Sequence, residues 1–324
     1  MSAGSSSRTW RPGPLHGYPG SAGQKGLTLI ELMISLTLGL LIVIAATSAF
    51  LSSKNAYTAG DDATHIDDTG RFALEIIARS LRQAAYVDWD RNESPAVVKP
   101  GMSPSIEGLD ARSLKASTTG MTSPQTQSVN GSDTLSVQFF GAADGTMLNC
   151  AGFPVAGGQR GSSIFYVATD GTGEPQLYCK YSGDDGWSSD AIARGIEAFH
   201  VLYGLDTDND GISNRLLNAA AINALDDAAV GAGESAVRNA KTHWKKVVAV
   251  NVALLVRGSA NADPGGNAAS DVYDLFGKEY SEQHGAGDQG VRLSKEDLPA
   301  STRNRLRKVF STTIQLRNAA DGAD

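Results

Sequence analysis

One carboxylate lies inside a long apolar segment near the start of the chain. Residues 27–51 carry a single ionisable side chain, that of Glu31. As a helix this segment reaches about 37 Å, enough to cross a hydrocarbon core of roughly 30 Å. A carboxylate costs about 2.5–3.5 kcal/mol at the bilayer centre, and less near its edge, so it needs a positively charged partner. Cleavage between Gly26 and Leu27 would create one, the new α-amino group on this chain or on a neighbour.

An acidic loop is the second arrangement that could do chemistry. The sequence D-x-D-x-D-G at residues 206–211 is the first half of a calcium-binding loop, whose alternate carboxylates converge on a hard cation. The candidate ligands are Asp206, Asp208, Asp210, the carbonyl of Ile212, and Asn214. Leu217 stands where such loops place a bidentate Glu, and Asp226 or Asp227 could replace it. We expect a weak calcium site, with a solvated acidic turn as the alternative.

The two cysteines, Cys150 and Cys179, are a third candidate. In an exported domain such a pair predicts a disulfide, which would stabilise the fold by about 3–4 kcal/mol on the chain-entropy model. Two unpaired buried thiols are the alternative. A metal site would need more ligands nearby, and no histidine lies close in sequence.

The charge balance argues against a nucleic-acid surface. The chain carries 35 acidic and 28 basic residues, whereas nucleic-acid binding needs a clustered positive excess, so no specific nucleic-acid partner is predicted. One basic cluster precedes the end of the chain, and we expect it to be a solvated turn before the last strand. Its members are Arg303, Arg305, Arg307 and Lys308.

Charges around the apolar segment predict its orientation. Basic residues precede it, and several acids follow it within a few turns: Arg8, Arg11 and Lys25 before, and Asp61, Asp62, Asp67 and Asp68 after. By the positive-inside bias, the N-terminus stays in the cytoplasm and the body crosses the inner membrane. An ordinary single-span anchor would explain the hydrophobicity, but it would not explain Glu31.

The rest of the chain predicts one long helix followed by an antiparallel sheet, an α+β fold. Small and apolar residues recur at helical spacing from Ala56 to Ala84, so the helix should continue to about Ala85. Residues 91–127 should form an irregular loop, and the Ala-rich residues 215–241 a helix with a break near Gly231. Strands are expected at 135–139, 164–167, 176–179, 196–203, 248–256 and 310–316.

These motifs resemble those of a known family. The run from Lys25 and Gly26 through Leu27-Thr28-Leu29-Ile30-Glu31 resembles the class III signal of type IV prepilins. In that family a peptidase cuts after the glycine and methylates the new amine. Segments 196–211, 244–257 and 309–318 resemble the middle and final strands of PilW-type minor pilins, whereas 91–127, 215–241 and 259–297 show no usable match.

The resemblance implies a domain plan. It consists of a leader at 1–26, a transmembrane and assembly helix at 27–51, its amphipathic continuation at 52–86, an irregular loop at 87–130, and a β-rich periplasmic head at 131–324 with insertions at 215–241 and 259–297. After processing at Gly26 and Leu27, Glu31 would pair with the amine of an adjacent subunit.

The implied function is a minor pilin that helps to start a type IV pilus and form its tip, in support of motility, adhesion or DNA uptake. Its partners would be prepilin peptidase, other minor pilins, the major pilin and a PilY-type tip adhesin. One alternative is a minor pseudopilin of type II secretion, similar to GspJ. Another is a calcium-tuned adhesive tip domain. An enzyme is not expected, since no catalytic set of residues is visible in the sequence.

Overall fold

The computed structural model describes residues 26–87, 100–183, 186–230, 235–259 and 272–318. Apart from Gly26, the expected leader at 1–26 lies outside these residues, as does the expected helix break near Gly231. The chain divides into two compact units, residues 1–53 and 54–324, which are described separately.

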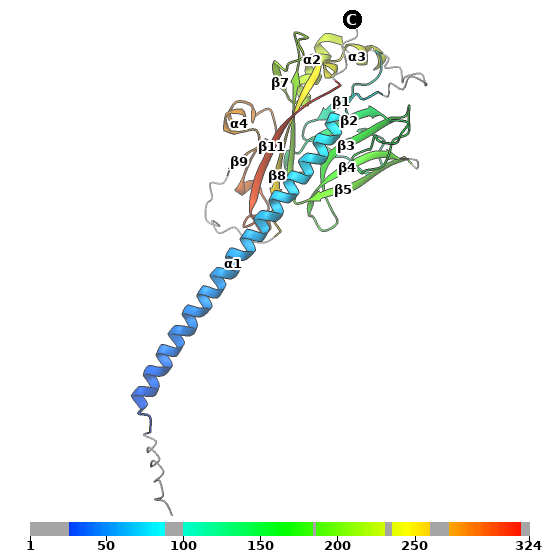
Figure 1. Cartoon of the computed structure of the whole chain (residues 1–324). Helices are drawn as coiled ribbons and strands as arrows, with labels where there is room; N and C mark the ends of the chain where they lie inside the picture. The colour runs from blue at the N-terminus through cyan, green and yellow to red at the C-terminus, as the bar shows by residue number, and fades with distance from the viewer. Residues whose placement is uncertain (1–25, 88–99, 184–185, 231–234, 260–271, 319–324) are drawn as a thin grey trace, which may run out of the picture. The chain divides into compact units, whose positions relative to one another are not determined.

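The first unit holds the beginning of the long helix α1, Leu29–Arg82 (Figure 1). Every described residue from Gly26 to Ser53 is exposed in the isolated chain. The helix is long and apolar enough to cross a membrane, and it is the one such helix among the described residues.

The second unit holds the rest of α1, two larger antiparallel sheets and a small two-stranded sheet (Figure 1). The first sheet has the order β1-β2-β3-β4-β5, so each strand pairs with its neighbour in sequence. Its strands are β1 Ile106–Leu109, β2 Thr134–Phe140, β3 Arg160–Thr169, β4 Pro175–Gly183 and β5 Gly186–Arg194. Such sequential pairing needs only short connections and no crossover.

The second sheet has the order β11-β8-β6-β7. Its strands are β6 Ile196–Leu205, β7 Arg215–Leu217, β8 Val247–Arg257 and β11 Arg307–Gln315. Strand β6 is buried at every position, and apart from Glu197 and His200 its two faces are apolar, as expected for a strand covered on both sides. The connections carry α2 Ala219–Val230, α3 Ser235–Lys241 and α4 Lys278–His284, the small pair β9 Val272–Asp274 and β10 Arg292–Ser294, and the 3-10 turns η1 Val129–Gly131, η2 His243–Lys246, η3 Lys295–Asp297 and η4 Ala300–Thr302.

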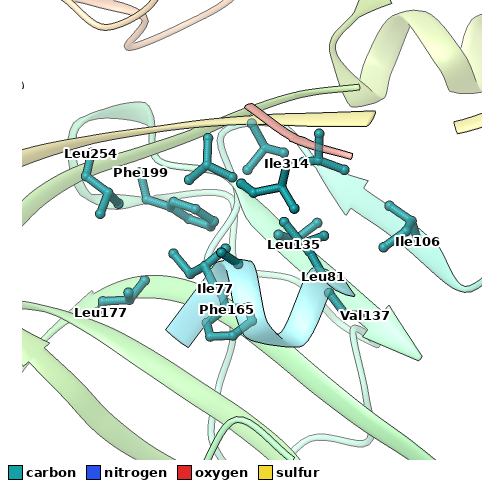
Figure 2. Packing of buried hydrophobic residues seen from close by; sticks show 14 of the residues in the cluster. Ile77, Leu81, Ile106, Leu135, Val137, Phe165, Leu177, Phe199, Leu254 and Ile314 are labelled. Carbon is teal, nitrogen blue, oxygen red and sulfur yellow. The ribbon is translucent and has the colours of Figure 1, made fainter. Parts of the chain in front are cut away.

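The main core is formed where the second half of α1 packs between the two sheets. Ile77 and Leu81 are fully buried, and Figure 2 shows them beside Leu135 and Phe165 of the first sheet and Ile314 of β11. The buried positions of this half of α1 follow one helical stripe: Asp62, Ile66, Gly70, Ala73, Ile77, Ala78, Ser80 and Leu81.

The expectation of an irregular loop at 91–127 is wrong in part. Strand β1 lies inside it and pairs with β2 in the register Ile106 to Val137. The sheet domain therefore begins before residue 131, the boundary expected from sequence. Four residues are too short to show a clear period of two, so pairing with β2 decides their structure.

Three further regions differ from the sequence expectations. Residues 215–217 form the short strand β7, and the Ala-rich helix begins only at Ala219. Strand β5 was not expected, because its sequence shows no regular alternation of apolar and polar residues; five of its nine residues are exposed. The described part of 259–297 is also structured, with β9, α4 and β10. In each case contacts distant in sequence outweigh the local pattern.

Candidate processing and assembly site

The start of α1 places the Gly26–Leu27 bond outside the helix. Thr28 caps the helix: its carbonyl accepts the amide of Leu32 at 3.1 Å, and its hydroxyl accepts the amide of Glu31 at 3.3 Å. Gly26 and Leu27 are exposed and precede this cap. The bond between Gly26 and Leu27 would therefore be accessible to a peptidase, because the helix begins only after these residues.

Thr28 is a residue whose role the sequence reasoning missed. The spacing Thr28-x-x-Glu31 is the capping-box pattern, which marks a helix N-terminus. Glu31 lies in the first turn, where the amide groups without helical partners favour a negative charge. The cap thus fixes Glu31 within one turn of the amine that cleavage would create at Leu27.

The segment that follows presents apolar side chains on all sides. From Leu27 to Leu51 its large apolar residues are 52–77% exposed. The hydroxyls in this segment bond back to their own helix, as Ser35 does to the carbonyl of Glu31 at 2.7 Å and Thr47 to that of Val43 at 2.8 Å. Hydroxyls satisfied in this way can enter lipid or an apolar helix bundle without losing hydrogen bonds.

The second half of α1 is bound to the head by polar contacts as well as by its apolar stripe. Asp62 is 3% exposed, and it accepts the amide of Ser259 at 2.8 Å. Asp67 forms an ion pair with Lys308 of β11 at 2.7 Å. Two of the acids that follow the apolar segment in sequence therefore anchor the helix to the sheets.

The structure confirms the disulfide between Cys150 and Cys179. The two Cα atoms lie 5.8 Å apart, within the usual range for a bridge. The bond ties the loop before β3 to the centre of β4, and both residues belong to the main core.

The acidic loop after β6 brings three predicted ligands together. Oxygen atoms of Asp206, Asp208 and Asp210 lie within 4.8 Å of one another. Asp206 also organises the loop, since it accepts the amides of Asn209 at 2.6 Å and Gly211 at 2.7 Å. Desolvation acts to raise the pKa of Asp206, but these hydrogen bonds outweigh it and lower the pKa below its ordinary value.

The other two expected ligand residues also take part in hydrogen bonds within the loop. The amide oxygen of Asn214 accepts the backbone N–H of Thr207 at 3.2 Å, and the amide of Ile212 donates to Asp210 at 2.7 Å. The idea that Asp226 or Asp227 completes the site is wrong. Asp226 is buried and bonded to Thr242 and His243, and Asp227 forms an ion pair with Arg238 at 2.7 Å.

The expected solvated basic turn before the last strand is wrong for Arg307. Its side chain is 0% exposed, and it pairs with Glu197 of β6 at 2.5 Å. Glu197 also pairs with Arg257 of β8 at 2.9 Å, and Arg257 contacts Glu174 in the turn between β3 and β4. A buried charge normally persists only with such partners. The cluster therefore joins the strands, and it offers little free positive charge.

An exposed apolar helix that begins just after a Gly–Leu junction, joined to a head of antiparallel sheets, defines a type IV pilin-like protein. Comparisons with family models agree. The prokaryotic N-terminal methylation motif matches residues 21–47, and type IV pilus-assembly protein W matches residues 164–318. Both matches are consistent with the PilW family, whose members are structural pilus components rather than enzymes. No curated protein and no solved structure matches it.

These two matches have direct consequences for the first unit. The methylation motif implies processing by prepilin peptidase, and the family implies interaction with other pilins. The apolar part of α1 accordingly anchors the protein in a membrane and associates it with a pilus.

Proposed function

We propose that this protein is a minor pilin, cleaved between Gly26 and Leu27, methylated on the new amine, and incorporated into a type IV pilus. There it helps to start assembly and form the tip complex, with other minor pilins, the major pilin and a PilY-type adhesin as partners. One observation carries the proposal: Glu31 is held by a helix cap one turn from the cleavage point, on an otherwise apolar helix.

Charge pairing explains why assembly would need Glu31. In a bundle of apolar helices, the carboxylate of one subunit and the Leu27 amine of the next neutralise each other. An offset register would leave both charges buried without a partner. The scale of the penalty is given by buried pairs from which one member is removed, a change that costs about 3–5 kcal/mol. The pair would therefore select one register between neighbouring subunits.

Substitution of Glu31 tests this role. We expect Glu31→Ala and Glu31→Gln to reduce the amount of this protein in sheared pili by at least about tenfold, because the neighbour's amine loses its partner. The level in the membrane should stay unchanged. Ser48→Ala is a matched control, since its hydroxyl bonds only within the helix, to the carbonyl of Ile44 at 2.8 Å. Normal incorporation of Glu31→Ala would contradict the proposal.

The proposed orientation places the N-terminus in the cytoplasm and residues 54–324 in the periplasm before assembly. The basic residues before the apolar segment and the acids after it support this orientation. A cysteine-reactive reagent that cannot cross membranes should label an exposed position of the head, such as Asp68→Cys, in spheroplasts of intact inner membrane. Labelling only after lysis would reverse the orientation.

The same helix would serve a pseudopilin of type II secretion, similar to GspJ. The PilW match favours the pilus, because it covers residues 164–318 of the head. Deletion of the gene separates the two roles. Loss of surface pili with normal enzyme secretion supports the pilus, and the reverse phenotype supports the secretion system.

We also propose that the acidic loop binds calcium weakly and so tunes the head for adhesion. The support is the approach of three carboxylates to within 4.8 Å, of which Asp208 and Asp210 are exposed to solvent. A bound cation would relieve their mutual repulsion. Isothermal titration should show heat with the wild type and with the control Asp68→Ala, and none with Asp208→Ala. A wild type that releases no heat would end this proposal.

A further inference from the structure

Strand β11 lies at the end of its sheet, with β8 as its neighbour and no strand on its other side among the described residues. The hydrogen bonds show which of its backbone groups are free. Leu316 donates to the carbonyl of Val248 at 2.9 Å, and Gly258 donates to that of Leu306 at 2.9 Å, in one uninterrupted register. Bonded pairs alternate in antiparallel sheets, so the even-numbered residues of β11 bond to β8.

The odd-numbered residues therefore direct their N–H and C=O groups away from the sheet. From Val309 to Gln315 this edge contains no proline and no charge, and its pairing with β8 shows no bulge. Prolines, charged side chains and bulges are the features that usually prevent a sheet edge from pairing with another strand. The charges of the strand lie at its beginning, where Arg307 and Lys308 are already paired within the chain.

A groove of about 880 Å³ lies on the face of the sheet next to this edge. Its lining includes the odd-numbered side chains Val309, Ser311 and Thr313, with Asn251 of β8. Helix α4 and the residues before it form another part of the lining, with Phe276, Glu279, Tyr280 and Gln283. The same face of β11 thus offers polar side chains, beside backbone groups that are free to pair.

The charge of the groove indicates what it would accept. Two carboxylates line it, those of Asp274 and Glu279, and the described lining residues include no Lys or Arg. Asp274 pairs with Arg292 at 3.5 Å, whereas Glu279 is exposed. A basic side chain entering the groove would therefore meet a carboxylate, beside the rings of Phe276 and Tyr280.

We propose that β11 and this groove form a binding site for an extended segment of another polypeptide, with a basic residue among small or β-branched ones. The segment adds to the sheet as a further strand. Its backbone pairs with the odd-numbered residues of β11, and its alternate side chains, the basic one included, enter the groove. Backbone pairing supplies affinity in this mode, and the pockets for alternate side chains supply specificity.

This inference goes beyond the role of Glu31, and its test involves neither cleavage nor filament formation. The probe is a labelled, end-blocked peptide, Thr-Val-Lys-Val-Thr-Val-Thr, added to the detergent-solubilised full chain. Fluorescence anisotropy should show saturable binding. A matched peptide with methyl groups on alternate backbone nitrogens should bind at least about tenfold more weakly, because it cannot complete the ladder.

Variants of the protein separate the ladder from the groove. Ser311→Pro removes one outward N–H group without removing a bond to β8, so the sheet should tolerate it at this edge. We expect about fivefold weaker binding, with Ser311→Ala as the matched control that keeps the N–H group. Glu279→Gln should weaken binding of the lysine peptide by about threefold at low salt. Binding of a peptide with Thr in place of Lys should stay unchanged.

Three results would overturn the proposal. The first is no binding by the wild type, and the second is equal binding of the N-methylated peptide. The third is a wild-type dimer in sedimentation that Ser311→Pro converts to a monomer, since a second copy of this chain would then occupy the edge. The methylated peptide keeps the test decisive even if Ser311→Pro fails to fold. Failure here would leave incorporation through Glu31 untouched.

Discussion

The two halves of α1 are built on different plans although they form one continuous helix. In the first half, residues 29–53, every side chain is exposed in the isolated chain, and apolar residues occupy all sides. In the second half one stripe is apolar, and it is buried between the two sheets of the same chain. The second half finds its partners within the protein, whereas the first half needs lipid or neighbouring helices around it.

The largest difference in stability should come from replacing one leucine of each half with alanine. Leu81 is fully buried, and Leu81→Ala should lower the free energy of unfolding of the head by about 2–5 kcal/mol through lost packing and a cavity. Leu40 is exposed, and Leu40→Ala should leave head stability unchanged. Denaturant unfolding in detergent, followed by the fluorescence of Trp187 and Trp244, measures both. Equal losses of unfolding free energy in the two variants would contradict the proposed difference between the halves.

The disulfide should matter to the head alone. Cys150 and Cys179 are 29 residues apart in sequence, and losing their bond should cost about 3–4 kcal/mol of head stability on the chain-entropy model. The double variant Cys150→Ser with Cys179→Ser should show this loss in the same unfolding assay. Cleavage at Gly26 should continue at the normal rate, because the bond lies far along the chain from the processed end. Loss of cleavage would show that processing depends on the structure of the head.

One carboxylate of the head should make its stability depend on pH. Glu107 of β1 is partly buried in the head, where desolvation raises its pKa from the ordinary value of 4.5 to about 7; Arg160 opposes the rise and Asp226 adds to it. A raised carboxyl pKa disfavours the ionised form in the folded protein. Head stability should therefore fall as pH rises from about 4.5 through 7.

Replacing that carboxyl should remove the pH effect. Glu107→Gln should stabilise the head by roughly 1–2 kcal/mol at pH 8, and should have almost no effect below about pH 4. Unfolding curves at the two pH values test the sign. A constant difference between variant and wild type at all pH values would show that packing, rather than ionisation, is responsible.

Two glycines of α1 give the smallest and most local test. At Gly60 an added methyl group meets nothing within 4 Å, so Gly60→Ala should stabilise the helix by about 0.5–1 kcal/mol. At Gly70 it would lie 2.6 Å from the ring of Phe310 on β11. Gly70→Ala should therefore destabilise the head by about 1 kcal/mol despite the better helix former. A gain at both positions would show that Phe310 moves aside freely.

Much of the fold could be predicted from local patterns. The stripe from Ala56 to Ala84 predicted the second half of α1, which ends at Arg82, and the alternation of Val248 to Val256 predicted β8. Strands β1, β5 and β7 could not be predicted, because their structure depends on pairing with distant strands. Burial of Arg307 was missed for the same reason: its partner Glu197 is far away in sequence.

The candidate site divides in a similar way. Local spacing predicted the approach of Asp206, Asp208 and Asp210. The spacing Thr28-x-x-Glu31 also indicates the helix cap, although the predictions did not use this signal. The free edge of β11 could not be read from the sequence, since an edge is defined only by the order of strands in a sheet. Sequence thus indicated the sites that one short segment builds, and the structure was needed for those built by several.

The most direct test of the central claim is mass spectrometry of the N-terminal peptide of this protein, recovered from sheared pili. If Glu31 is matched by an amine that processing creates, the recovered chain should begin with a methylated Leu27. A chain that still carries Gly26 in functional pili would contradict the account, because Glu31 would then be buried without that partner.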